Sequence, residues 1–363
     1  MNTLRILLLA LALGAAALAT SAAAAAYPTA GGSAAPTVSA AVALVADPAP
    51  SPTATPQLTI SADPATVTAG DTVTLTVHLG IPAASVQLSD IPAGETVPTP
   101  IATLTTNDTG DAVWSGAPSV TTTYQADYAG DGVDWLPATA DVAVPVAPRI
   151  TFSAAVRAYS GTRVKLRLQV RPAHPGGAVT VQIQKDGVWA DLRTVTLGDD
   201  SRALMSWRTG SLGQWPLRAV MAADAQHVEG DSAVHTITVI KPNPYNVPIN
   251  AKSMIVVVVS QYRLHFFSYG VQLRSFPCVT GRPSLPTPIG HFRVYQKVMW
   301  PGGPNGARMM KYHYPVAIHG TNQPWLLKRF PRNFSHGCTR LLNKNVIWVY
   351  DHTPVGTRVW NLP

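Results

Sequence analysis

Ser335-His336-Gly337-Cys338-Thr339-Arg340 is the stretch of this 363-residue chain that most constrains its fold and chemistry. It holds one of only two cysteines, and Ile318-His319-Gly320 precedes it. A thiol attacks as its thiolate, so it needs a neighbouring base or a positive field. The pattern predicts Cys338 as a nucleophile and His319 as its base, with the Gly320 carbonyl orienting the imidazole. Gly337 allows a tight turn, so that consecutive N–H groups near Cys338 could point at a developing oxyanion.

Ordered motifs extend this pattern into a resemblance. His-Gly-x followed by Ser-His-Gly-Cys-x-Arg resembles the signature of the L,D-transpeptidase (YkuD-like) family. The upstream segments Val279-Thr280-Gly281 and Thr287-Pro288-Ile289-Gly290-His291-Phe292 are similar to further motifs of that family. The resemblance covers roughly residues 254–362. It implies a mostly β fold, with the His and Cys motifs at one end of the sheet, and no cofactor.

The resemblance also implies roles for single residues. His319 is then the general base, and His336 supports the oxyanion site or the substrate; the reverse assignment, with His336 as the base, stays open. Arg340 either binds a substrate carboxylate or lowers the pKa of the thiol. Further substrate contacts are expected at Trp300, Tyr312 and Asn343.

The implied activity is that of a peptidoglycan L,D-transpeptidase. The Cys338 thiolate would attack a tetrapeptide stem between its third, diamino residue and the terminal D-Ala, and the acyl-enzyme would pass to an amine of a neighbouring stem. Carbapenem-type β-lactams are expected to acylate the same thiol. Two alternatives stay open: an L,D-carboxypeptidase that uses water as the acceptor, and a non-enzymatic cell-wall-binding protein.

Zinc is the main chemical alternative for the same side chains. His319, His336 and Cys338 could form a three-ligand site with an open position. No Cys-x-x-Cys or His-Glu-x-x-His accompanies them, and carboxylates to orient the histidines are missing, so no metal is expected. Cys278 lies in an apolar run and is expected to be a small buried hydrophobe. A Cys278–Cys338 disulfide, which would inactivate the enzyme, is the alternative.

Charge is unevenly distributed along the chain. Residues 251–363 carry fourteen Lys or Arg and one acid, Asp351, whereas residues 1–250 carry thirteen basic and eighteen acidic residues. The C-terminal third therefore suits a polyanionic partner. In an exported protein an anionic cell wall fits better than nucleic acid, and no obligate protein partner is evident. One acid also excludes a paired-carboxylate glycosidase mechanism in this region.

The N-terminal residues predict export. Arg5 precedes an apolar run from Ile6 to Leu18, and Ala24-x-Ala26 offers a small-residue cleavage site. Residues 1–26 are therefore interpreted as a signal peptide, with an uncleaved membrane anchor as the alternative. Residues 27–56 are almost entirely Ala, Pro, Thr, Ser, Gly and Val, which is typical of an extended linker. The protein is expected to be extracytoplasmic, wall-associated or secreted.

Strict alternation of apolar residues begins after the linker. The pattern of residues 73–79 returns in residues 164–170, which predicts a repeated all-β module. The two copies, residues 57–147 and 148–241, look like bacterial immunoglobulin-like β-sandwiches. They are expected to contain no clustered His or Cys and no paired acids, so their expected role is to extend the reach of the catalytic domain from the membrane.

A Pro-rich break at residues 242–252 precedes the catalytic domain, residues 253–363. Strands are expected there at residues 254–260, 264–269, 271–278, 291–298, 317–319 and 357–360. A short helix is expected from Asn343 to about Tyr350, and a lid over residues 300–306, which are rich in Gly and Pro. The fold class predicted for the whole chain is mainly β: two immunoglobulin-like β-sandwiches followed by a mostly-β catalytic domain.

Overall fold

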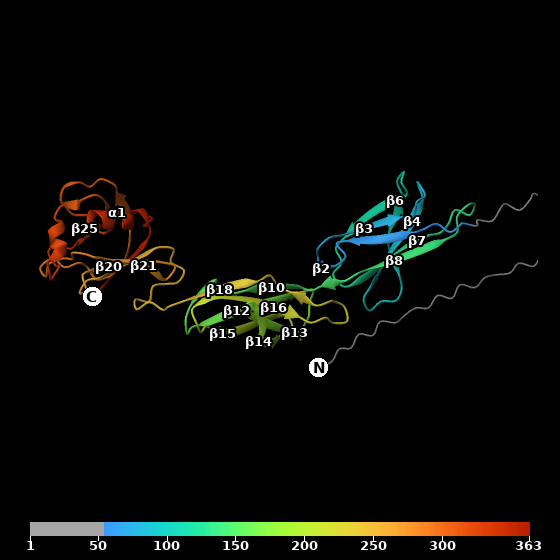
Figure 1. The fold of residues 1–363 in the computed structure, drawn as a ribbon, viewed down its shortest axis with the longest axis horizontal. Helices are drawn as coiled ribbons and strands as arrows, with labels where there is room; N and C mark the ends of the chain where they lie inside the picture. The colour runs from blue at the N-terminus through green and yellow to red at the C-terminus, as the bar shows by residue number, and fades with distance from the viewer. Residues whose placement is uncertain (1–53) are drawn as a thin grey trace, which may run out of the picture. The chain divides into compact units, whose positions relative to one another are not determined.

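The computed structural model describes residues 54–363, so the predicted signal peptide and nearly all of the predicted linker lie outside the described residues (Figure 1). Strands dominate this part of the chain, which contains a single α-helix, α1 (Asn343–Asp351). The prediction of a mainly β chain is therefore confirmed. No helix within these residues is long and apolar enough to cross a membrane.

The first β module consists of two main sheets and one two-stranded sheet, coloured blue to green in Figure 1. In the three-stranded sheet β1-β3-β6, the central strand alternates buried Val73, Leu75 and Val77 with more exposed residues, as predicted. The second sheet has the order β5-β4-β7-β8, and its inward side chains share one core with those of β3. The strands are β1 (Thr59–Asp63), β2 (Val67–Thr68), β3 (Val73–His78), β4 (Ser85–Pro92), β5 (Thr99–Thr105), β6 (Asp111–Gly116), β7 (Thr122–Tyr128), β8 (Ala138–Val144) and β9 (Val146–Ala147), which pairs with β2.

The second module repeats this arrangement. Its sheets have the orders β10-β12-β15 and β11-β18-β16-β13-β14, so that β12 takes the central place that β3 has in the first module. Residues of both sheets, Leu166 and Val181 among them, pack into one core. The strands are β10 (Arg149–Ser153), β11 (Arg157–Tyr159), β12 (Arg163–Arg171), β13 (Ala178–Lys185), β14 (Val188–Thr196), β15 (Arg202–Arg208), β16 (Gly213–Met221), β17 (Gly230–Asp231) and β18 (His235–Ile240). The internal repeat seen in the sequence thus corresponds to a repeated topology.

The C-terminal region contains two further sheets, coloured orange to red in Figure 1, with the orders β21-β20-β19-β27-β22 and β23-β24-β25-β26. Their strands are β19 (Met254–Val258), β20 (Arg263–Ser268), β21 (Val271–Pro277), β22 (Gly290–Arg293), β23 (Gln296–Val298), β24 (Met309–His313), β25 (Val316–His319), β26 (Thr339–Arg340) and β27 (Arg358–Leu362). Short 3₁₀ turns occur at η1 (Gly303–Asn305) and η2 (Pro324–Lys328). The single strand predicted over residues 291–298 is wrong, because the chain passes from one sheet to the other between β22 and β23.

The core of this region explains the continuous apolar run of β19. Ile255 and Val257 face one apolar cluster, while Met254, Val256 and Val258 face another, so the strand is buried on both sides. A strand covered on both faces carries no polar alternation. Helix α1 contributes Val346 and Val349 to the first cluster, which fixes the helix over the sheet that carries His319.

Leu264→Ala should destabilise this region by about 2–5 kcal/mol, because Leu264 is fully buried and its loss leaves a cavity. Leu273→Ala is the matched control: the same side chain on the next strand is 49% exposed, and its loss should cost only about 0.5 kcal/mol or less. Denaturant titration in a Cys338→Ala background measures this through the reactivity of Cys278, which is buried in the same core. Equal costs for the two variants would contradict the placement of this core.

Candidate active site

Two short parallel strands bring the predicted catalytic side chains together. Ile318 pairs with Thr339, and His319 pairs with Arg340. Paired residues of the two strands lie side by side, so His319 lies beside Arg340, and Cys338 directly precedes β26. Ile318 and Thr339 are fully buried. The pairing therefore brings His319, Arg340 and the turn that carries Cys338 together.

Cys338 is a partly exposed free thiol. The Ala317 N–H donates to its Sγ over 3.4 Å. Burial raises the pKa of the Cys338 thiol, and neither that N–H nor the nearby Arg340 charge reverses the shift. The resting side chain is a thiol that must lose its proton before it attacks.

His319 is held as a neutral base. Its Nδ1 lies 2.6 Å from the Gly320 carbonyl oxygen, and since a carbonyl only accepts, Nδ1 carries the proton and Nε2 keeps its lone pair. The side chain is 3% exposed. Burial lowers the pKa of His319 to about 4, the Arg340 charge acts in the same direction, and the bond to Gly320 opposes them. At neutral pH the imidazole can therefore accept a proton at Nε2.

His336 occupies a different environment. It is exposed in the turn before Cys338, whereas His319 is buried in a strand that pairs with the strand after Cys338. This placement favours His319 over His336 as the base.

The turn that carries the nucleophile is fixed by two hydroxyl groups. The Ser335 hydroxyl donates to the Cys338 carbonyl at 2.6 Å and accepts the Gly337 N–H at 3.2 Å. The buried Thr287 hydroxyl donates to the Gly337 carbonyl at 2.9 Å and accepts the Gly281 N–H at 2.9 Å. Gly337 has a φ of 103°, which glycine adopts without strain. Sequence reasoning did not assign this role to Thr287.

The same contacts modify the expected oxyanion site. The Gly337 N–H already donates to Ser335, so it is not a free member of a pair of oxyanion donors. The N–H groups of His336 and Cys338 are the remaining candidates in this turn.

Asn343, which was predicted as a substrate contact, is exposed and also holds backbone N–H groups in place. Its Oδ1 accepts the N–H groups of Ala307 and Thr321 at 3.2 and 3.0 Å. A Cβ at Gly320 would lie 2.2 Å from the same oxygen. Asn343 thus holds the loop after His319, and only glycine fits at position 320.

Tyr312 was also predicted as a substrate contact, but it is buried. Its ring is 4% exposed in the apolar core, and its hydroxyl accepts a hydrogen bond from Asn361 Nδ2 at 3.0 Å. Burial raises the pKa of Tyr312 to about 12. The side chain packs behind the site and offers no surface to a substrate.

Trp300 is exposed, and Arg340 is partly buried without a charged partner in the described part of the chain. Trp300 is 75% exposed, and the Arg308 guanidinium lies 4.5 Å from its ring centroid. The Arg308 carbonyl accepts the Gly320 N–H at 3.1 Å, which links this aromatic residue to the His319 loop. Within residues 54–363, Arg340 forms no ion pair, and its buried Nε has no hydrogen-bond partner.

The second cysteine lies in the core. Cys278 is fully buried and free, and burial raises the pKa of its thiol to about 12. The alternative of a Cys278–Cys338 disulfide is therefore not realised in this structure.

Within the described residues, His319, His336 and Cys338 do not converge as metal ligands; the three side chains that do are His174, Asp224 and His227. The expectation that the sandwiches contain no clustered histidines is wrong. His174 lies about fifty residues before Asp224 and His227 in the sequence, and the fold of the second sandwich brings the three together.

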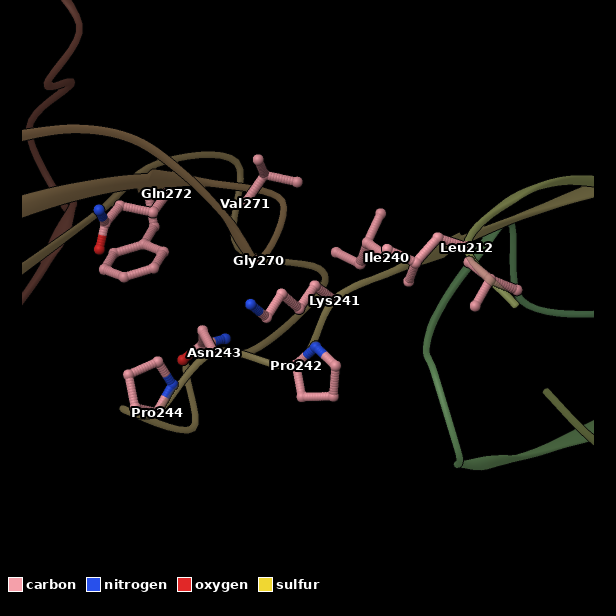
Figure 2. Close-up of a pocket in the computed structure, with 11 residues that line it drawn as sticks. Leu212, Ile240, Lys241, Pro242, Asn243, Pro244, Gly270, Val271 and Gln272 are labelled. Atoms are coloured by element: carbon pink, nitrogen blue, oxygen red, sulfur yellow. The ribbon is translucent and has the colours of Figure 1, made fainter. Parts of the chain in front are cut away.

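The pocket drawn in Figure 2 lies elsewhere in the chain. It is lined by residues 240–244, by residues 270–272, and by Leu212, Val239 and Phe267. None of the predicted site residues lines it, and it offers no nucleophile. It is not the candidate active site.

Comparisons with known proteins agree on the region around Cys338. Residues 252–360 match the YkuD family, described as the L,D-transpeptidase catalytic domain. The chain is 34% identical over 121 residues to a putative L,D-transpeptidase YkuD of Bacillus subtilis (strain 168), covering 32% of this chain and 68% of that protein. It is 32% identical over 120 residues to the Bacillus licheniformis protein of the same name, covering 32% of this chain and 67% of that protein. A solved L,D-transpeptidase in complex with imipenem shares 16% identity and a TM-score of 0.27, covering 59% of this chain and 99% of that one.

Alkylation of Cys338 should keep accelerating with pH up to and beyond 9.0, the ordinary pKa of a thiol, because burial raises the pKa of this thiol. His319, with a pKa of about 4, is uncharged at neutral pH and cannot hold a thiolate by ion pairing. Intact-protein mass after timed iodoacetamide treatment measures the rate, and Cys278 should stay unmodified in the folded protein. A rate that levels off at neutral pH would mean that a thiolate–imidazolium pair exists at rest.

Thr287→Val should lower turnover while costing about 1–3 kcal/mol of stability, because the isosteric side chain leaves the Gly281 N–H and the Gly337 carbonyl unpaired in a buried site. Thr287→Ser keeps the hydroxyl and is the matched control. The measurement compares the acylation rate of Cys338 with the unfolding midpoint for both variants. A valine variant that acylates at the wild-type rate would show that these bonds do not position the nucleophile.

Proposed function

Since the chain belongs to the YkuD family of L,D-transpeptidase catalytic domains, we propose that it cross-links peptidoglycan peptide stems through an acyl-enzyme on Cys338. The observation that carries the proposal is the pairing of β25 with β26, which brings His319 beside Arg340 and next to the turn that carries Cys338, together with the bond from Nδ1 of His319 to the Gly320 carbonyl, which leaves the lone pair on Nε2.

The proposed reaction uses these residues as follows. His319 Nε2 takes the thiol proton as Cys338 Sγ attacks the carbonyl carbon of the bond before the terminal D-Ala. The tetrahedral intermediate collapses to a thioester, and the D-Ala amine leaves with the proton from His319. An amine of a second stem then attacks the thioester and gives its proton to His319. Cys338 leaves as the thiolate and recovers a proton from His319, which restores the resting enzyme.

The surroundings of the thiol suit a peptide with a free carboxylate. Arg340 has no carboxylate within ion-pair distance in the described residues, so its guanidinium can pair with an acidic group of the stem. Trp300 adds exposed aromatic surface close to the His319 loop. The imipenem complex of a solved L,D-transpeptidase supports the further proposal that β-lactams acylate Cys338 in this chain.

The sandwiches and the N-terminal residues have a proposed role in placement. Export would carry the protein outside the cytoplasm, and the linker with two β modules would hold Cys338 away from the membrane. A form that begins at Asn250 would then keep its chemistry on soluble stems and lose activity on intact wall.

Cys338→Ala should abolish cross-linking, and His319→Ala should slow it by about 10²–10⁴-fold through loss of the base, with a smaller loss for His336→Ala. The assay incubates purified stems with each variant and identifies dimers, released D-Ala and the acyl-enzyme by mass spectrometry. His336→Ala is the matched control for His319→Ala, since both remove an imidazole near the same thiol.

Each outcome of this assay has a definite meaning. Cross-linking by Cys338→Ala would contradict the mechanism, and a larger loss for His336→Ala would reverse the assignment of the base. Release of D-Ala without dimers, in the presence of excess acceptor stem, would identify an L,D-carboxypeptidase.

A further inference from the structure

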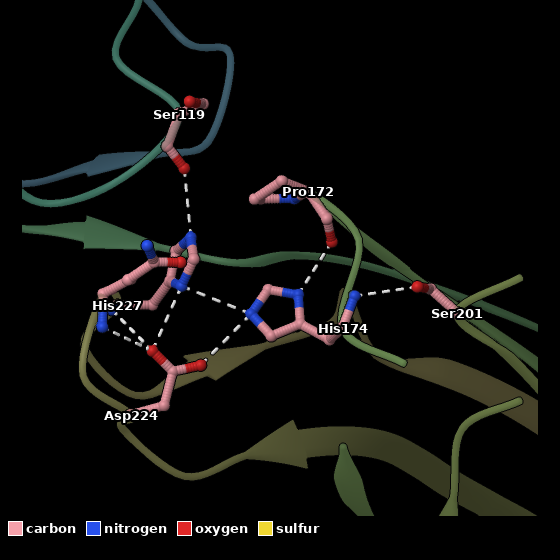
Figure 3. Close-up of polar contacts among 7 residues, drawn as sticks. Ser119, Pro172, His174, Ser201, Asp224 and His227 are labelled. Carbon is pink, nitrogen blue, oxygen red and sulfur yellow. Dashed lines mark hydrogen bonds and ion pairs between the residues drawn. The ribbon is translucent and has the colours of Figure 1, made fainter. Parts of the chain in front are cut away.

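Two histidines and an aspartate converge in the second sandwich, on strands other than those that carry Cys338 and His319. His174 belongs to the loop between β12 and β13, whereas Asp224 and His227 belong to the loop between β16 and β17 (Figure 3). His174 Nε2 lies 3.2 Å from His227 Nδ1 and 3.2 Å from Asp224 Oδ2. His227 Nδ1 lies 3.2 Å from Asp224 Oδ1. Three polar groups from two loops thus surround one point.

The outer nitrogens of both rings are already committed as donors. His174 Nδ1 lies 2.7 Å from the Pro172 carbonyl oxygen, and His227 Nε2 lies 3.0 Å from the Ser119 carbonyl oxygen. Carbonyl oxygens only accept, so each of these nitrogens carries a proton. In the neutral imidazoles, the nitrogens that face each other, Nε2 of His174 and Nδ1 of His227, both hold lone pairs.

Three electron-pair donors therefore meet without a hydrogen between them. Such an arrangement is repulsive unless a cation lies among the three groups. A single proton can join only one pair of atoms, whereas a metal ion accepts all three donors at once. Zinc with bonds of 2.0–2.1 Å to nitrogen in a tetrahedral site places neighbouring ligand atoms about 3.3 Å apart. His174 Nε2 lies 3.2 Å from both His227 Nδ1 and Asp224 Oδ2, close to that spacing, and the three ligand atoms all lie within 4.8 Å of one another.

The outer hydrogen bonds of the two histidines and the burial of their side chains are also typical of a metal site. Metal-binding histidines usually donate their other N–H to a carbonyl or carboxylate, as both rings do here. The side chains of His174 and His227 are 8% and 2% exposed, while that of Asp224 is 36% exposed, which leaves a route for an ion and a water. Asp224 Oδ1 accepts the N–H groups of Gln226 and His227 at 2.7 and 2.8 Å, so Oδ2 is the oxygen left for a ligand.

We propose that His174 Nε2, His227 Nδ1 and Asp224 Oδ2 bind one divalent transition-metal ion, zinc first, with water as the fourth ligand. Two imidazoles and a carboxylate without a thiolate suit zinc and related divalent ions and disfavour Cu(I). The ion ties the β12–β13 loop to the β16–β17 loop of the second sandwich. It is a structural cross-link, separate from the chemistry of Cys338.

A comparison of the two sandwiches distinguishes the hydrogen bonds that Asp224 forms within its turn from its proposed role as a metal ligand. The corresponding loop of the first sandwich has Asp131, whose Oδ1 likewise accepts backbone N–H groups, those of Val133, Asp134 and Trp135. No histidine accompanies it there. The turn therefore forms without imidazoles, and the two histidines of the second copy need another explanation.

The test uses untagged full-length protein stripped with EDTA and then titrated with zinc. Bound metal is measured by elemental mass spectrometry after desalting, affinity by calorimetry, and stability by thermal unfolding. One equivalent of zinc should bind and raise the unfolding midpoint of the second sandwich, because the ion binds only the folded site. His174→Gln and His227→Gln should each weaken binding by roughly tenfold or more. The stripped variants should melt close to the stripped wild type.

Two control variants make the result specific. His78→Gln removes a histidine that pairs with a single acid, Asp111, in the first sandwich, and it should leave zinc binding unchanged. Cys338→Ser should also keep the full equivalent, and cobalt substitution should give tetrahedral d–d bands without a thiolate charge-transfer band. The proposal is overturned if wild-type protein binds no zinc, if His174→Gln and His227→Gln bind it as tightly as wild type, or if Cys338→Ser loses it.

Discussion

The pairing of β25 with β26 is the constraint on which the active site depends. It consists of two residue pairs, Ile318 with Thr339 and His319 with Arg340, too few to be stable alone. The chain supports β26 from its other side, where Val279 and Arg340 exchange both backbone hydrogen bonds at 2.9 Å. The strand that follows the nucleophile is thus held between the His319 strand and the upstream Val-Thr-Gly segment.

That arrangement gives a physical reason for the upstream motifs. The sequence identified them only through resemblance, because their contacts join residues about fifty positions apart and leave no local pattern. Thr287 reaches the Gly337 carbonyl from the Thr-Pro segment, and Gly281 must be glycine because a Cβ would lie 2.3 Å from the Leu285 carbonyl oxygen. The Val-Thr-Gly and Thr-Pro motifs look like a second set of functional residues, but they hold the turn that carries the nucleophile in place.

The sequence determined the strands more fully than it determined the site residues. Alternation located β3 and β12, since period-two burial is a local property. Tyr312 was misassigned although the sequence held a signal. It lies between Lys311, which is partly buried, and His313, which is exposed, so alternation places Tyr312 on the buried face of β24. The cluster of His174, Asp224 and His227 had no such signal, because loops from different strands form it.

Burial disfavours the charged form of both the Cys338 thiol and the His319 imidazole. It raises the pKa of Cys338 and lowers that of His319, so both changes oppose a resting ion pair. Arg340 lowers both pKa values, which favours the thiolate but not the imidazolium. Charge therefore separates only during attack, when the developing oxyanion can be stabilised by the turn.

β27 completes one sheet of this region and contacts the other. It lies in the interior of its sheet, parallel to β19 and antiparallel to β22, and its fully buried Asn361 donates to Tyr312 of β24 and to the Pro288 carbonyl. That sheet cannot close until the ribosome has made residues 358–362, whereas each sandwich can fold from residues already made. The nucleophile is thus synthesised before the sheet that packs behind its own sheet is complete.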